Sequence, residues 1–82
     1  MEILSLHPEI ADYLKKHKLE KKFNKQARFL ETDIRHPGLG VELLEPKHLK
    51  LFSFRVNRKY RAIFIFRDND AIEIIDVNNH YQ

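Results

Sequence analysis

The stretch KLFSFRVNRKYRAIFIFR, residues 50–67, contains two runs in which every second residue is apolar. Successive side chains of a strand point to opposite sides, so Phe52, Phe54 and Val56 share one face of the first run. The second run has its own apolar face, made of Tyr60, Ala62, Phe64 and Phe66. This alternation predicts two β-strands, each with one buried side.

The connection between the two strands determines their register. A two-residue loop would place Val56 opposite Arg61 and mix apolar with charged faces, because a shift of one residue inverts every side chain. A loop of about three residues, 57–59, instead pairs Val56 with Tyr60 and Arg55 with Arg61. The two arginines then lie side by side on the exposed face of the sheet. Because like charges repel, this arrangement is best tolerated where an anion binds between them.

The residues before this hairpin predict a short strand and two helices. EILSL, residues 2–6, reads as a strand, and Pro8 suits the first turn of a helix because its missing N–H needs no partner there. The second helix is expected to end at HPG, residues 36–38. Its apolar residues recur every three or four positions and form one buried stripe, which consists of Leu19, Phe23, Ala27, Leu30 and Ile34.

A third strand, AIEIIDV at residues 71–77, follows a turn at residues 68–70. If it pairs with the second strand of the hairpin, its far end returns to Arg55 and Arg61. His80 and Tyr81 are then expected to converge with the arginines. Imidazole ordinarily titrates near pH ~6.5, so His80 suits proton transfer. The competing interpretation is that these two residues are a solvated tail.

Length and composition limit the possible classes of protein. Eighty-two residues fit a single domain, 1–82, and no apolar run approaches the ~20 residues that span a bilayer. The chain has no cysteine and no secretion signal at Met1, so we expect a cytoplasmic protein without membrane contact. Its five histidines are scattered without ligand-like spacing, so no metal site is expected.

The positive charge is concentrated in one part of the chain. The net charge is +3, and residues 47–67 contain no acidic residue. A concentrated basic surface of this kind favours binding of a polyanion. The basic residues in that segment are Lys47, Lys50, Arg55, Arg58, Lys59, Arg61 and Arg67.

The order of predicted elements, together with HPGL (36–39), LFSFRVNRKYRAIF (51–64) and a final strand reaching the end, resembles the RelE/ParE toxin superfamily of bacterial type II toxin–antitoxin systems. The resemblance covers nearly the whole chain. GVELLEP (40–46), FSFRVNRKYR (52–61) and the closing HY are most similar to the YoeB-like branch of mRNA interferases. The resemblance implies an α+β fold of order β-α-α-β-β-β, with the helix pair packed on one face of an antiparallel sheet.

The resemblance also implies roles for individual residues. Arg61 matches the arginine that stabilises the scissile phosphate, and Arg55 matches a second phosphate-binding cation. Glu42 matches the general base, His80 the general acid, and Tyr81 the tyrosine that helps to hold the substrate.

Other basic residues are expected to contribute to substrate binding. In YoeB-like enzymes a lysine soon follows the acidic residue, whereas this chain has Glu45. Lys47 or Lys50 could replace that charge. Arg58 and Lys59 complete the expected phosphate-binding set.

The implied reaction is metal-free RNA cleavage, in which a ribose 2′-hydroxyl attacks the adjacent phosphate, without a cofactor. The implied partners are the ribosome, mRNA and a cognate antitoxin whose acidic segment covers the two arginines. Two alternatives remain open at this point. One is a ParE-like poison of DNA gyrase on the same fold, and the other is a non-catalytic relative that binds RNA or a partner through its basic face.

Overall fold

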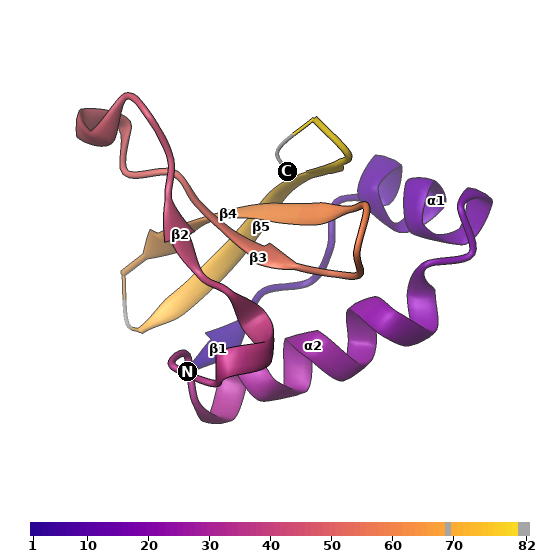
Figure 1. The fold of residues 1–82 in the computed structure, drawn as a ribbon, viewed down its shortest axis with the longest axis horizontal. Coiled ribbons are helices and arrows are strands. Elements are labelled where there is room, and N and C mark those ends of the chain that lie inside the picture. The colour runs from indigo at the N-terminus through magenta and orange to yellow at the C-terminus, as the bar shows by residue number, and fades with distance from the viewer. Residues whose placement is uncertain (69, 81–82) are drawn as a thin grey trace.

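Within residues 1–68 and 70–80, which the computed structural model describes, two helices pack against a five-stranded mixed sheet of order β1-β5-β4-β3-β2 (Figure 1). The helices are α1 (Pro8–Lys16) and α2 (Glu20–Thr32), and two 3-10 turns are η1 (Pro37–Leu39) and η2 (Lys47–Leu49). The strands are β1 (Glu2–Ile3), β2 (Glu42–Leu43), β3 (Phe52–Arg55), β4 (Arg61–Arg67) and β5 (Ala71–Asn78). None of the described helices is long and apolar enough to cross a bilayer.

The register of the β3–β4 hairpin is the one expected from the alternation of its residues. Arg55 pairs with Arg61, and the Val56 N–H donates to the Tyr60 carbonyl at 2.9 Å. Asn57 closes the turn, since its Oδ1 accepts from the backbone N–H of Lys59 and of Tyr60, both at 2.8 Å. The apolar alternation and the turn therefore agree on one pairing, which places the two arginines side by side.

The expected α+β fold with a helix pair on the sheet is confirmed, but the sheet is mixed and has one strand more than expected. β1 pairs in parallel with β5, because the chain enters α1 directly after β1 instead of turning back beside it. A further strand, β2, pairs antiparallel with β3 at the opposite edge. β2 has only two residues, too few to produce an alternating pattern that the sequence could reveal.

The core lies between the helices and one face of the sheet. Leu14, Phe23 and Leu30 of the helices are almost fully buried, and they meet Phe54 and Phe64 of the sheet. The predicted apolar stripe of α2 is therefore confirmed. α2 ends at Thr32, four residues before the expected stop at His36.

The phenylalanines of the hairpin allow a test of this packing. Phe54 is 0% exposed and lies in the core, whereas Phe66 is 45% exposed at the end of β4. Phe54→Ala should lower the free energy of unfolding by about 3–5 kcal/mol, because it leaves a cavity. Phe66→Ala, the matched control, should cost only about 1 kcal/mol. Equal losses in chemical denaturation would contradict this position of the core.

Candidate active site

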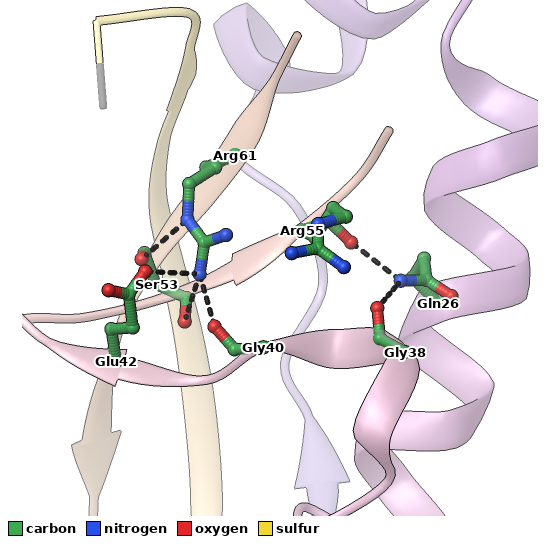
Figure 2. A network of polar contacts seen from close by, with 7 residues as sticks. All are labelled: Gln26, Gly38, Gly40, Glu42, Ser53, Arg55 and Arg61. Atoms are coloured by element: carbon green, nitrogen blue, oxygen red, sulfur yellow. Dashed lines mark hydrogen bonds and ion pairs between the residues drawn. The ribbon is translucent and has the colours of Figure 1, made fainter. Parts of the chain in front are cut away.

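Arg61, the first residue of β4, lies at the centre of a buried polar network (Figure 2). Its Nε donates to the Ser53 hydroxyl at 2.9 Å, and its Nη2 donates to the Gly40 carbonyl. Nη2 also lies 3.3 Å from a carboxylate oxygen of Glu42. The residue is only 8% exposed. A buried charge is tolerated when it is paired and hydrogen-bonded in this way.

The burial of Arg61 corrects the expectation that both arginines stand on an exposed face. The Arg61 side chain starts from β4 and crosses β3 to reach Gly40 and Glu42 beside the β2 edge. β2 was not expected, so the sequence did not predict that residues 40–42 would lie against the Arg61 side chain and bury it. Burial lowers the pKa of the Arg61 guanidinium; the Glu42 carboxylate opposes this shift and Arg55 adds to it. The group stays protonated, as arginines do in proteins.

Arg55 is the solvent-exposed arginine of the pair. Its guanidinium forms no hydrogen bond or ion pair within the part of the chain that the structure describes. A Cβ added to Gly40 would lie 3.4 Å from Nη2 of Arg55 and 3.8 Å from Nη1 of Arg61. Both guanidinium groups therefore approach the same backbone position. Together, Arg55 and the Nη1 side of Arg61 can bind an oxyanion.

Glycine suits position 40 because of its backbone conformation. Its φ of +53° lies in the left-handed region, which favours glycine. A Cβ there would stand in ordinary van der Waals contact with the Arg55 guanidinium, so the preference for glycine comes from the backbone.

Four residues of the network in Figure 2 were not expected as site residues: Gln26, Gly38, Gly40 and Ser53. Ser53 could have been found, because the alternation that places Phe52 and Phe54 on the core face places Ser53 with Arg55 and Arg61. Gln26 lies between Phe23 and Leu30 at helical spacing, so it is a polar residue on an apolar stripe. The contacts of Gly40 depend on the fold and have no local signal.

His80 follows the end of β5 and is exposed. Arg61 pairs with Asn78, and the His80 N–H donates to the Asn78 side chain at 3.0 Å, so the backbone at His80 is held two residues beyond the arginine pair. The expected return of β5 to this end of the sheet is therefore confirmed. The role of the His80 imidazole stays a prediction. Tyr81 lies outside the described residues.

The other basic residues do not gather around Arg61. Lys47 and Lys50 lie in the β2–β3 connection, beyond the opposite end of β3 from Arg55. Lys50 borders an apolar hollow with Leu49, Phe52, Ile65 and Phe66. Both lysines therefore lie away from Arg55 along β3, and their role in phosphate binding stays a prediction.

Arg58 and Lys59 are exposed in the β3–β4 turn, closer to Arg55. Arg58 and Arg55 line one depression together with Lys22, Lys25 and Gln26 of α2. Within residues 1–68 and 70–80, no group of three or more His, Asp and Glu side chains could hold a metal ion.

Comparison with known proteins identifies one matching family model and one curated relative. A family model described as the RelE-like toxin HigB of type II toxin–antitoxin systems matches residues 5–80. An uncharacterized protein of Haemophilus influenzae is 44% identical over 51 residues, which are 61% of this chain and 45% of that protein. The chain thus spans less than half the length of this curated relative.

Solved structures share the fold. A chain of the heterotetrameric YoeB–YefM toxin–antitoxin complex from Staphylococcus aureus has a TM-score of 0.69 and 23% identity, over 99% of this chain and 98% of that one. A YoeB/ParE toxin from Agrobacterium tumefaciens has a TM-score of 0.66 and 18% identity, over 99% and 100% of the two chains. The helix pair on a mixed sheet is thus the architecture of these toxins.

The bond between Arg61 and Ser53 can be tested by its effect on stability. Ser53→Ala leaves a buried charged donor without its acceptor, so the free energy of unfolding should fall by about 1–3 kcal/mol. Ser5→Ala, at an exposed site, should change it by less than about 0.5 kcal/mol. Chemical denaturation of the two variants measures the difference, and no extra loss in Ser53→Ala would show that Arg61 does not depend on the hydroxyl.

Proposed function

This chain belongs to the HigB-like family of RelE-like toxins of type II toxin–antitoxin systems, and we propose that it is an endoribonuclease that cleaves mRNA on the ribosome and so inhibits translation. The observation that carries the proposal is the pairing of a buried, oriented arginine with an exposed carboxylate. Arg61 is 8% exposed, whereas the side chain of Glu42, 3.3 Å away, is 65% exposed. A fixed cation beside an accessible base suits cleavage of RNA by its own 2′-hydroxyl.

In this reaction the 2′-oxygen attacks the adjacent phosphorus, and the bond from phosphorus to the 5′-oxygen breaks. Glu42 accepts the proton of the 2′-hydroxyl, and His80 gives a proton to the departing 5′-oxygen. The products are a 2′,3′-cyclic phosphate and a free 5′-hydroxyl. No covalent bond to the protein forms, so these residues supply only proton transfer and electrostatic stabilisation.

The two arginines stabilise the negative charge that grows on the phosphate during attack. Arg61 is suited to this role because Ser53 and Gly40 already hold its guanidinium, so little reorientation is needed in the transition state. Arg55 is exposed and adds a second donor on the same side. The phosphate approaches the Nη1 side of Arg61, next to Arg55, so Glu42 can keep its contact with Nη2.

Tyr81 helps to hold the substrate beside His80, and Arg58 and Lys59 bind the flanking RNA backbone from the β3–β4 turn. Lys47 and Lys50 are left for more distant phosphates, because they lie beyond the other end of β3. The ribosome presents the mRNA.

A cognate antitoxin silences the enzyme by covering the arginine pair. The YoeB proteins from Staphylococcus aureus were solved in complex with YefM, which is described as their antitoxin. In this chain the exposed Arg55 guanidinium favours an acidic segment of the partner. Copurification of the antitoxin without loss of RNA cleavage would count against this mode of inhibition.

Mapping of mRNA 5′ ends after brief induction in bacteria tests the proposed function. Wild-type protein should produce new ends inside translated codons, and His80→Ala should lower the rate of cleavage by about 10²- to 10⁴-fold, because it removes the general acid. His48→Ala, an exposed histidine in η2, is the matched control and should cleave like wild type.

Three results would contradict parts of this account. Wild-type activity in a folded His80→Ala variant would remove His80 from the mechanism. Intact mRNA together with DNA damage would indicate gyrase poisoning instead. Intact mRNA and intact DNA in cells that stop growing would indicate a binding protein without nuclease activity.

A further inference from the structure

Gln26 joins α2 to two backbone carbonyls beside the arginine pair (Figure 2). Its side-chain Nε2 donates to the Gly38 carbonyl at 3.0 Å and to the Arg55 carbonyl at 2.7 Å. Both partners can only accept, so the amide must point its nitrogen at them. Both hydrogens of this nitrogen are thereby used, and the half-buried side chain is held at two points.

The Arg55 carbonyl needs this partner because β2 begins only at Glu42, opposite Ser53, and so has no residue opposite Arg55. The Val56 N–H bonds toward β4, and neighbouring residues of a strand direct their polar groups to opposite edges, so the Arg55 carbonyl faces the β2 side. The last pair between β2 and β3 is Glu42 with Ser53. Gln26 therefore takes the place of a missing strand residue at this edge.

The segment that Gln26 holds carries the contacts of the active site. Gly38 precedes Gly40, whose carbonyl accepts from Arg61, and Glu42 follows two residues later. A shift of residues 38–42 away from β3 would move the Gly40 carbonyl and the Glu42 carboxylate together. The spacing between this segment and β3 therefore sets the orientation of the Arg61 guanidinium.

We propose that Gln26 is a positioning residue for RNA cleavage, which fixes the segment from Gly38 to Glu42 against β3 and thereby orients Arg61. It acts through Gly40 and Glu42 and touches no reacting atom. The kinetic part of this proposal rests on the proposed nuclease function. The structural part, the orientation of Arg61, does not.

Gln26→Met removes both hydrogen bonds and keeps the length of the side chain. In single-turnover cleavage on programmed ribosomes, its rate at saturation should fall by about 10- to 100-fold, since a misplacement of about 1 Å can cost that much. The ribosome concentration that gives half the maximal rate should stay unchanged. Asn24→Met, at an exposed position two residues earlier and so on the opposite side of α2, is the control and should match wild type.

A second measurement is independent of cleavage. Arginine-specific NMR of the folded variants follows rotation of the Arg61 guanidinium about its Nε–Cζ bond, which should be faster in Gln26→Met and unchanged in Asn24→Met. Gln26→Glu, which has the same shape but cannot donate when ionised, replaces Gln26→Met if that variant does not fold.

The outcomes separate this inference from the proposed function. A wild-type cleavage rate in a folded Gln26 variant overturns the positioning role, as does a variant whose only defect is weaker ribosome binding. If wild-type protein cleaves no mRNA, the proposed function fails and the NMR measurement decides alone. Unchanged Arg61 rotation in the Gln26 variants then overturns the inference.

Discussion

The site depends on the hydrogen bonds that hold a buried Arg61 guanidinium across β3. A charge in such a position is costly unless its donors are satisfied, and here Ser53, the Gly40 carbonyl and Glu42 satisfy them from one side. This leaves Nη1 facing Arg55, where a phosphate can approach. The same hydrogen bonds therefore make burial of the charge tolerable and fix the orientation of the guanidinium. A fixed orientation is what stabilisation of a transition state requires.

Much of the fold could be predicted because it depends on the pattern of neighbouring residues. The alternation in β3 and β4, combined with the length of their turn, is compatible with one register only, and that register places Arg55 beside Arg61. The elements that escaped prediction lack such a pattern. β2 has two residues, and the parallel pairing of β1 joins the first and last strands of the chain.

The same distinction applies to the site. The arginine pair follows from register, and the position of His80 near it follows from the return of β5 beside β4. The burial of Arg61 could not be predicted, because it arises where residues 40–42 meet β3 and β4 from a distant part of the sequence. Lys47 and Lys50 were expected to bind phosphate because of their charge, and this stays a prediction. The β2–β3 connection places them beyond the end of β3 that is opposite Arg55.

The central claim is that the orientation of the Arg61 guanidinium, and not only its charge, drives the reaction. Single-turnover cleavage by Arg61→Lys, compared with Arg61→Ala, tests this most directly. Lysine keeps the charge, but its single nitrogen cannot occupy both the position of Nε beside Ser53 and the position of Nη2 beside Gly40. The account predicts that Arg61→Lys loses about 10²-fold in rate and resembles Arg61→Ala. A lysine variant that cleaves within a few-fold of the wild-type rate would contradict it.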